Sequence, residues 1–312
     1  MGAGKIETTE IAGEVIIDPV NLVVGATGLL GSDICRNLVS AKQPVRALVR
    51  STSDPVKVDA LKRLRVTLVA GDLKDRASLV AACRGVTTVV TTVSSTFSRQ
   101  PGDSIQTVDQ DGQLRLIDAA RAAGVTRFIY ISYSHQLNTD SPLTTAKRTV
   151  ERQLLSSGLT YTILAPTFFM EVWLSPALGF DPDNGTAQIY GSGANPISWI
   201  SAGDVARFAV AAIDNPAAAN ATVELGGPDA LTPLQVVAAF EAARGRKLTV
   251  THVPEEALRA QYAAATDPLQ RSFAALTLGY ALGDAIAMKM TLRLFPISLL
   301  SVQEYAGRKP GK

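Results

Sequence analysis

The chain contains 312 residues, of which 46% are hydrophobic, and its formal net charge is +2. This length and apolar content suffice for one large α/β domain, or for one domain with a smaller lobe. The near-neutral charge provides no basic field for nucleic acid, and no apolar run reaches the ~18 residues of a membrane-spanning helix. We therefore expect a protein with no nucleic-acid and no membrane partner.

Residues 1–19 are predicted to be a lead-in to the fold, in which Glu14–Ile17 has the composition of a short strand. The N-terminus has no long apolar core of the kind found in signal peptides, and Ile6 stands where a myristoylation signal requires Ser or Thr. The two cysteines, Cys35 and Cys83, fall in predicted helices, where we expect buried and reduced thiols. These features together favour a cytoplasmic protein.

Short apolar strands alternate with helices from residue 20 to residue 166. The expected strands are 20–24, 45–50, 66–70, 87–93, 127–132 and 160–164, and the expected helices are about 29–41, 54–63, 78–83, 103–123 and 145–157. Buried β-branched strands that alternate with helices are typical of a doubly wound parallel sheet. We therefore predict a doubly wound α/β domain over residues 20–166.

The alternation changes after residue 166. Large apolar side chains fill 167–174, and loops punctuated by Gly and Pro are expected over 176–196. Further elements are expected as a helix at about 203–213, a strand at 223–225, a helix opened by Thr232 and Pro233, a strand at 247–252, and a mostly helical tail. We predict a small C-terminal substrate-binding lobe over residues 167–312, interleaved with the C-terminal edge of the sheet.

A Gly-x-x-Gly-x-x-Gly motif follows the first expected strand and opens the first expected helix. Gly25 would allow a sharp turn, Gly28 a close approach of a pyrophosphate, and Gly31 close packing of the helix on the sheet. The unpaired N–H groups and the dipole of the helix N-terminus favour bound phosphate. The motif therefore predicts a dinucleotide site made by Gly25, Ala26, Thr27, Gly28, Leu29, Leu30 and Gly31. With this motif, residues 20–166 are predicted to form a Rossmann NAD(P)-binding domain.

Arg50 and Ser51 stand at the end of the second expected strand, where an NAD-preferring site has Asp or Glu. A guanidinium can hold a 2′-phosphate through two hydrogen bonds, whereas an acidic side chain would repel it. The sequence therefore favours NADP(H) over NAD(H), although Arg50 has an alternative interpretation as an ordinary exposed arginine. Asp72 and Leu73, just past the third strand, are predicted to lie near the adenine, and the alternative for Asp72 is a turn or cap residue.

These motifs resemble those of the atypical short-chain dehydrogenase/reductases, and specifically the NmrA-like group. The matching segments are 25–31, 49–50, 71–73, 127–132, 146–151, 157–166 and 200–206. The resemblance implies a Rossmann fold and an NADP(H) cofactor. The group includes NADPH-dependent quinone and triphenylmethane-dye reductases, isoflavone-reductase relatives, and regulators that bind the nucleotide but reduce nothing.

The wider superfamily carries a Ser and a Tyr-x-x-x-Lys motif, in which the Tyr exchanges a proton with the substrate and the Lys holds the nicotinamide ribose. The resemblance places Ser132 and Lys147 at the Ser and Lys positions, but Leu143 stands where the Tyr is expected. Lys147 would then bind the ribose or act as the acid itself, as the isoflavone-reductase resemblance suggests. The alternative is a solvated helix lysine that pairs with Glu151.

Two further proton donors are expected directly after the strand 127–132, at the edge of the sheet where such folds bind ligands. Tyr133 could donate as a phenol, and His135 could carry a proton near neutral pH. The alternative for both is an ordinary solvated loop residue. Neither His135 nor His252 has a partner at metal-ligand spacing, and we therefore predict no metal site.

The remaining predictions concern the nicotinamide end of the site. Thr92, Val93 and Ser94, together with Pro166 and Phe168, are expected to border the cofactor. A roof of large apolar side chains is expected over it, with core packing as the alternative role of each. The predicted roof consists of Phe169, Met170, Trp173 and Trp199.

We therefore predict an NADPH-dependent oxidoreductase, monomeric or homodimeric, that transfers hydride to a hydrophobic aromatic, quinone-like or enone compound. The missing Tyr disfavours ketone reduction more than quinone reduction, because water can protonate a quinolate. The alternatives are a non-enzymatic NADP(H) redox sensor and an accessory reductase in the biosynthesis of an aromatic natural product.

Overall fold

The computed structural model describes residues 19–96 and 100–308. A seven-stranded sheet forms its centre, in the order β3-β2-β1-β4-β5-β6-β9, and all of its strands run parallel. The strands are β1 (Asn21–Val24), β2 (Val45–Val49), β3 (Thr67–Ala70), β4 (Thr88–Thr91), β5 (Arg127–Ile131), β6 (Thr160–Pro166) and β9 (Ala221–Leu225). The predicted doubly wound α/β fold is confirmed.

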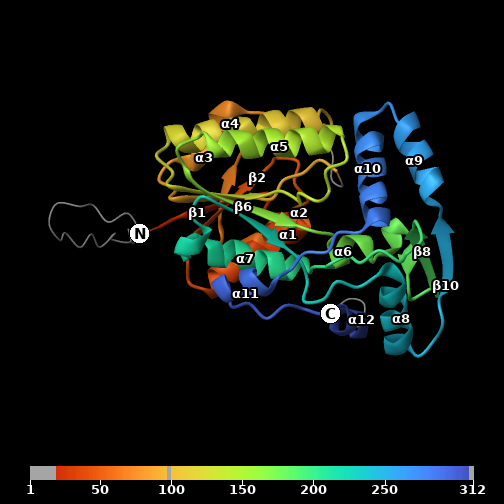
Figure 1. Ribbon diagram of the computed structural model, residues 1–312. Coiled ribbons are helices and arrows are strands. Elements are labelled where there is room, and N and C mark those ends of the chain that lie inside the picture. Colours follow the sequence, from red (N-terminus) through yellow and green to blue (C-terminus); the bar gives the residue numbers. More distant parts are fainter. Residues whose placement is uncertain (1–18, 97–99, 309–312) are drawn as a thin grey trace.

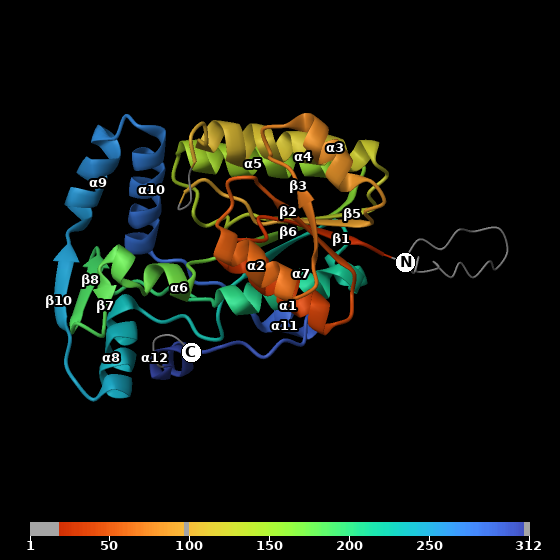
Figure 2. The ribbon, with the colours of Figure 1, turned by 180° about the vertical axis from the view of Figure 1, so that it is seen from behind.

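Helices cover both faces of this sheet (Figures 1 and 2). On one face lie α3 (Arg76–Cys83), α4 (Asp111–Ala122) and α5 (Pro142–Leu155). On the other face lie α1 (Leu29–Ser40), α2 (Pro55–Arg63), α7 (Ala202–Asp214) and α11 (Lys289–Leu294). Two layers of helices around one parallel sheet bury its apolar strands on both faces.

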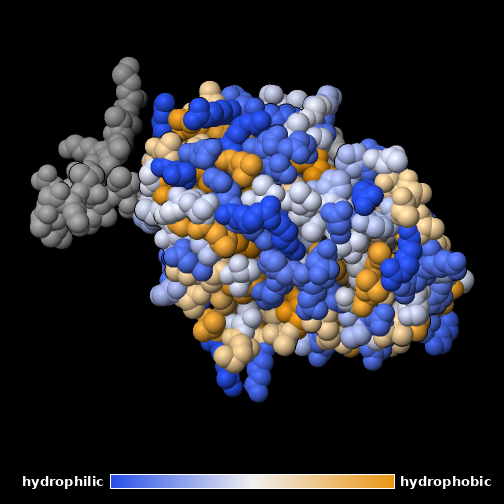
Figure 3. All heavy atoms as spheres, turned by 45° about the horizontal axis from the view of Figure 1, so that its top comes forward, coloured by the Kyte–Doolittle hydropathy of each residue, from blue (hydrophilic) through white to orange (hydrophobic). Residues whose placement is uncertain are grey.

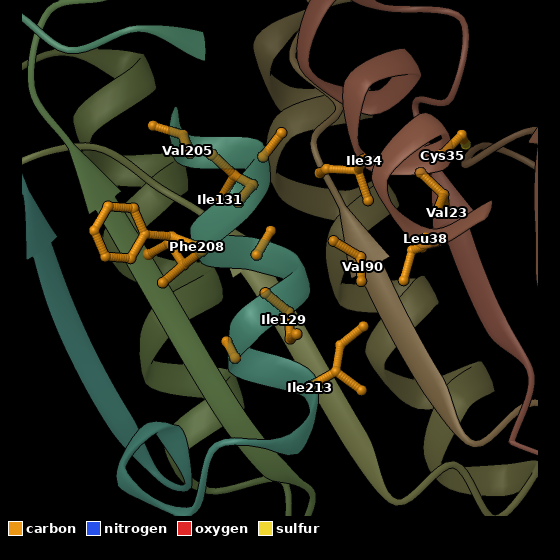
Figure 4. Close-up of a cluster of buried hydrophobic side chains, with 14 of the residues drawn as sticks. Val23, Ile34, Cys35, Leu38, Val90, Ile129, Ile131, Val205, Phe208 and Ile213 are labelled. Carbon is orange, nitrogen blue, oxygen red and sulfur yellow. The ribbon is translucent and has the colours of Figure 1, made fainter. Parts of the chain in front are cut away.

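The core on the α1 side joins segments that are far apart in the sequence. In Figure 4, Ile34 and Leu38 of α1 and Phe208 of α7 lie over the sheet residues Val90 and Ile129, and all five side chains are fully buried. This packing fixes α1, and with it the glycine turn that precedes α1, against the central strands.

A smaller lobe lies at one end of the sheet (Figure 1). Its three-stranded sheet consists of β10 (Thr249–Val253), β8 (Thr186–Tyr190) and β7 (Phe180–Asp181). Its helices are α6 (Met170–Trp173), α8 (Pro233–Arg244), α9 (Glu255–Ala264), α10 (Pro268–Leu282) and α12 (Val302–Gly307). Short 3-10 helices occur at η2 (Pro176–Leu178) and η3 (Pro216–Ala218).

The C-terminal half of the chain contributes to both the lobe and the main sheet. β9 pairs with β6 from Thr162↔Ala221 to Pro166↔Leu225, and α7 belongs to the layer that covers the sheet. The lobe is therefore interleaved with the sheet, and the strand expected to end before Pro166 continues through it. The strand expected at Glu14–Ile17 lies outside the described residues.

The loops expected over 176–196 include two strands, β7 and β8, so this prediction is wrong there. Glycines punctuate the segment, and Gly179 and Gly185 have φ values of +81° and +78°. The longer strand, β8, pairs in parallel with β10, whose residues follow more than 60 positions later. A strand whose pairing partner lies so far along the chain is difficult to predict from its local sequence.

Two expected helices begin earlier than predicted because their capping residues were not recognised. Asp75 accepts a hydrogen bond from Ala77 N and starts α3, whereas Ser141 accepts one from Thr144 N and starts α5. The helix expected over 103–123 is α4 preceded by the π-helix η1 (Ile105–Gln110).

The predictions for the two cysteines and for the start of α8 are confirmed. Cys35 and Cys83 are buried in α1 and α3, and burial raises the pKa of their thiols to about 12 and about 11. Thr232 caps α8 in a reciprocal capping box, with Pro233 as its first residue. In the described part of the chain, no helix is both long and apolar enough to cross a membrane. Figure 3 shows hydrophilic side chains spread between small apolar areas on one face of the molecule.

Candidate functional site

A cavity of about 560 Å³ lies at the carboxyl ends of β1, β4, β5 and β6. The chain leaves β1 and β4 in opposite directions along the sheet, and such a divergence is where open α/β sheets bind ligands. Fourteen of the predicted cofactor and catalytic residues line this cavity. They are Gly25, Thr27, Gly28, Leu29, Leu30, Arg50, Thr92, Val93, Ser94, Ser132, Tyr133, Lys147, Pro166 and Phe168.

The glycine turn forms the floor of the cavity. Gly25 has a φ of +91°, and a Cβ on it would lie 2.6 Å from Thr92 Oγ1. A Cβ on Gly31 would lie 2.1 Å from the Gly25 carbonyl oxygen, so close packing of α1 on β1 requires a glycine there. A Cβ on Gly28 would meet, among the described atoms, only the Gly25 oxygen at 3.2 Å, and Gly28 lines the cavity. The floor thus leaves room for a phosphate at the N-terminus of α1.

At one end of the cavity, two partly exposed cations hold the buried side chain of Asp103. Arg50 Nη1 lies 2.7 Å from Asp103 Oδ2, and Lys74 also pairs with Asp103. Gln100 N donates a further hydrogen bond to Asp103 at 3.0 Å. Burial alone would raise the pKa of Asp103, but the hydrogen bonds from Lys74 and Arg50 outweigh it and hold that pKa below its ordinary value. The sequence did not predict the contact between Arg50 and Asp103, because the two residues lie 53 positions apart.

Five residues predicted to bind the cofactor do not line the cavity. Ala26 is buried beneath the turn, Ser51 is exposed, and Gly31 packs against the backbone of the turn. Asp72 Oδ1 accepts a hydrogen bond from Lys74 N at 2.8 Å, which is the turn role that we gave as its alternative. Leu73 is buried in the core next to α4, because the chain turns inward after β3.

Lys147 is buried and lies at the other end of the cavity. Its Nζ donates a hydrogen bond to the Ile131 carbonyl oxygen at 3.1 Å and lies 5.0 Å from the centroid of the Tyr130 ring. Burial lowers the pKa of Lys147, although the charges of Asp109 and Glu151 oppose this effect. The alternative of a solvated lysine is therefore wrong, since only 5% of Lys147 is exposed.

The Lys147–Glu151 pair that we gave as the alternative is replaced by a different ion pair. Arg148 Nη1 lies 2.5 Å from Glu151 Oε1, and the same guanidinium donates to the carbonyl oxygens of Tyr133 and Ser134. Lys147 instead points from α5 to the end of β5. Sequence spacing alone does not predict which of the neighbouring residues Lys147 and Arg148 pairs with Glu151.

Leu143 and Tyr133 occupy the cavity wall near Lys147. Leu143 is buried, so the position of the superfamily Tyr holds an apolar side chain. Tyr133 donates its hydroxyl proton to Thr144 Oγ1 at 2.7 Å, and burial raises the pKa of this phenol. Tyr133 is thus a wall residue whose hydroxyl is engaged elsewhere.

Ser132 and His135 share a partner, Glu151. Ser132 lines the cavity and donates its hydroxyl proton to Glu151 Oε1. His135 does not line the cavity, because its ring lies between Glu151 and Glu224, with Nε2 at 3.0 Å from Glu151 Oε2 and Nδ1 against Glu224 Oε1. Glu151 and Glu224 come from α5 and β9, and sequence reasoning did not select either for this site.

The apolar wall of the cavity includes only part of the predicted roof. Phe169 and Trp173 line it, and they are joined by Leu137, Val172 and Leu276. Met170 and Trp199 do not line the cavity and are fully buried, so their assignment to the substrate pocket is wrong. Trp199 instead donates Nε1–H to the Leu231 oxygen at 3.0 Å and packs in the aromatic core of the lobe. A local run of large apolar residues does not reveal which side chains face inward.

Within residues 19–96 and 100–308, no three His, Cys, Asp or Glu side chains are grouped closely enough to hold a metal ion. The acidic residues near the cavity contact cations, hydroxyls or the His135 ring. The site therefore consists of backbone and cationic groups at one end and of buried polar groups with an apolar wall at the other.

A glycine turn at the switch point of a parallel sheet, with a cationic end and an apolar end, defines a dinucleotide-binding protein of the Rossmann class. The NmrA-like family model matches residues 20–306, which is nearly the whole chain. The chain belongs to the NmrA-like family, and the resemblance noted in its sequence is confirmed.

Three relatives illustrate the range of this similarity. The chain is 36% identical to the NAD(P)H azoreductase of Xenophilus azovorans over 229 residues, which cover 72% of this chain and 74% of the relative. It is 30% identical to a photosystem II assembly factor of Synechocystis sp. over 240 residues, which cover 76% and 72% of the two chains. The structure of an NADPH-dependent quinone oxidoreductase from Escherichia coli, solved with NADPH, is 25% identical and has a TM-score of 0.74, with 92% and 98% coverage.

Proposed function

We propose that this protein is an NADPH-dependent reductase that transfers hydride to a hydrophobic aromatic, quinone-like or azo compound. The observation that carries this proposal is a single cavity that joins the glycine turn and Arg50 to an apolar wall with a buried lysine. Similarity to an NAD(P)H azoreductase and to an NADPH-dependent quinone oxidoreductase supports the same reaction class.

The residues at the floor and at the cationic end fit NADP(H). Gly28 has no side chain toward the cavity, and α1 carries no acidic residue in its first turn, so its N-terminus suits a pyrophosphate. Arg50 would bind the 2′-phosphate with Lys57 nearby, and an acidic residue is absent from the end of β2. The bound cofactor would supply a hydride, while the protein supplies its position and the surrounding charges.

The buried end would hold the nicotinamide ribose and handle the proton. Lys147 lies at this end with a lowered pKa, so its ammonium group gives up a proton more readily than an exposed lysine does. Its hydrogen bond to the Ile131 oxygen fixes the direction of Nζ. Ser132 presents a hydroxyl group on the same wall.

The apolar wall favours a flat hydrophobic substrate over a sugar or a small acid. Phe169, Val172 and Trp173 line the wall from α6 and the segment before it, and Leu276 lines it from α10. Removal of such a substrate from water contributes about 25 cal/mol per Å² of apolar surface buried. The wall also excludes water from the site of hydride transfer.

The test is the oxidation of NADPH with a panel of quinones, azo dyes and aromatic ketones, followed by the loss of NADPH absorbance. We expect turnover with a quinone or an azo dye, slower turnover with ketones, and a lower rate with NADH than with NADPH. A matched assay with Lys147→Met would show whether the buried lysine takes part. Absence of turnover with every compound would contradict the proposal.

A second candidate is a nucleotide-binding regulatory or assembly protein that reduces nothing. Two observations favour it, namely Leu143 at the position of the superfamily Tyr and the similarity to a photosystem II assembly factor. Under this proposal, NADP⁺ and NADPH bind with clearly different affinities while no compound in the panel is reduced. Isothermal titration with both nucleotides would distinguish it from the reductase.

A further inference from the structure

A chain of hydrogen bonds leads from the cavity to the surface. It begins at Ser132, which lines the cavity and donates to Glu151 Oε1. It continues through Glu151, whose side chain is 9% exposed, to His135 Nε2 at 3.0 Å. It ends at His135, whose side chain is 41% exposed and which contacts Glu224 through Nδ1. Ser132 and His135 come from the end of β5 and the loop after it, whereas α5 and β9 supply the two carboxylates.

The contacts of His135 require an additional proton. A neutral imidazole has one N–H and one lone pair, whereas an ionised carboxylate can only accept hydrogen bonds. Both ring nitrogens of His135 lie at hydrogen-bond distance from carboxylate oxygens. The arrangement is therefore satisfied only if His135 is doubly protonated or if one carboxyl group holds the proton. Glu151 accepts from Ser132 and pairs with Arg148, which favours its ionised form, so the relay uses the form in which His135 holds the additional proton beside the cavity.

We propose that Ser132, Glu151 and His135 form a proton relay that supplies the proton for the reduction in place of the missing superfamily Tyr. This inference rests on the proposed reductase function. Ser132 is the catalytic residue of the relay, because it lines the cavity, whereas Glu151 and His135 act through it.

The relay supplies one proton for the hydride that the substrate receives. Hydride from bound NADPH would go to the electron-poor atom of the substrate and would leave an electron pair on a substrate oxygen or nitrogen. At the start, His135 is doubly protonated and Glu151 is a carboxylate. The substrate atom that carries this electron pair takes the hydroxyl proton of Ser132, while Glu151 takes the Nε2 proton of His135 and passes a proton to the serine oxygen. The neutral His135 ring then recovers a proton from solvent at its exposed edge. The substrate gains one hydride and one proton, while the three side chains return to their starting states.

The charges around the relay are balanced by neighbouring elements. Arg148 contacts both Glu151 and Ser132, at 2.5 and 3.3 Å, and so holds the carboxylate toward the hydroxyl. Lys147 adds a second positive charge on α5 near Glu151. On the far side, Asp284 accepts a hydrogen bond from Ser134 at 2.8 Å, and burial raises the pKa of Asp284. The Glu224 carboxylate, which comes from β9, contacts His135 Nδ1 and supplies the second negative charge beside the ring.

Kinetics with Glu151→Gln and His135→Gln test the relay, and His252→Gln and Glu255→Gln serve as matched controls. His252 contacts the Gly191 oxygen in the lobe, and Glu255 pairs with Arg259 on α9. We expect kcat to fall about 100-fold in Glu151→Gln and less in His135→Gln, with little change in the KM for NADPH. The solvent deuterium isotope effect on kcat should increase in both variants but in neither control.

A second readout does not depend on turnover. The chain contains two histidines, so His252→Gln leaves His135 as the single imidazole in a protein prepared without a histidine tag. Nitrogen-15 NMR of that ring reports its protonation. We expect a ring that is doubly protonated at neutral pH, and the loss of that second proton when Glu151→Gln is added.

The outcomes separate the relay from the proposed function. If the wild-type protein reduces no compound, the reductase function fails, and the NMR result alone decides whether the stored proton exists. If the wild-type protein is active but both relay variants keep its kcat and its isotope effect, the relay is overturned while the reductase function stands. A single neutral tautomer of His135 that is insensitive to Glu151→Gln would also overturn it.

Discussion

The two ends of the cavity use charge in opposite ways. At the Arg50 end, cations that are about one quarter to one third exposed surround the buried carboxylate of Asp103, and their hydrogen bonds lower its pKa. At the Lys147 end, the cation itself is buried, and burial lowers its pKa. Partly exposed cations bind an anion at small cost, whereas burial makes a lysine lose its proton more easily than in water. Under the proposed function, the Arg50 end binds the cofactor and the Lys147 end takes part in the reaction.

The largest effect is expected from a substitution in the glycine turn, which forms the floor shared by both ends of the cavity. In Gly31→Ala the new methyl group would meet the Gly25 oxygen at 2.1 Å, so α1 must move away from β1. We expect a loss of about 3 kcal/mol in the free energy of unfolding and a loss of nucleotide binding. Thermal and urea unfolding measure this loss.

The control for this prediction is Gly307→Ala, because a Cβ there would meet no described atom within 4 Å. Its free energy of unfolding should change by less than about 1 kcal/mol. Equal stability of the two variants would show that α1 tolerates displacement and that the turn is not tightly packed.

At the reacting end, Lys147→Met removes the buried charge and keeps most of the side-chain volume. We expect kcat to fall about 100- to 10,000-fold, because the proposed ribose anchor and the positive charge near Glu151 of the relay are lost. The melting temperature should stay the same or rise, since a buried cation is replaced by an apolar group. A steady-state assay combined with calorimetry separates these two effects.

The control on the same helix is Arg152→Met, whose side chain is exposed and contacts Thr149. Its kcat should match that of the wild type. If Lys147→Met keeps its activity but melts at a lower temperature, Lys147 is a structural residue and the contrast between the two ends fails.

At the binding end, Arg50→Gln should weaken NADPH binding and leave NADH binding unchanged. A charge-assisted pair with a phosphate contributes about 1.5 to 3 kcal/mol, so the Kd for NADPH should rise about 10- to 100-fold. Isothermal titration with both nucleotides gives the two affinities, and Arg259→Gln on α9 is the control. Equal weakening of NADPH and NADH binding would place Arg50 away from the 2′-phosphate.

The smallest expected effect concerns Asp103. The pKa of this group is depressed in the folded protein, so its carboxylate stabilises the fold above its ordinary pKa of about 4. That contribution is lost as the pH falls through the lower folded value. Asp103→Asn should therefore be less stable than the wild type by about 1 kcal/mol at neutral pH, and the difference should disappear in acid.

Urea unfolding of the wild type and of Asp103→Asn at several pH values tests this sign. A stability difference that grows as the pH falls would mean that the Asp103 carboxylate is not stabilised by Arg50 and Lys74. The same variant leaves Arg50 without its partner, so its NADPH affinity also shows whether Asp103 competes with the phosphate.

The sequence by itself predicted the parallel sheet, the glycine turn and the Arg50 end of the cavity. These features depend on local rules, since β-branched runs, helix caps and Gly spacing act over a few residues. Glycine at position 31 was expected for close packing, and the 2.1 Å approach of a Cβ there is the physical reason. The family resemblance, which rested on such local motifs, was likewise correct.

Which side chains face the cavity depends on the packing of segments that are far apart in the sequence, and the sequence pattern did not predict it. Trp199 and Met170 lie in the core of the lobe, and Asp103 reaches Arg50 from 53 positions away. Glu151 turned toward Ser132 and His135 rather than Lys147, because α5 places Lys147 against the end of β5. Such contacts depend on how helices and strands pack at long range. A sequence pattern predicts which face of a helix or strand is buried, but it does not predict which atoms of other elements that face contacts.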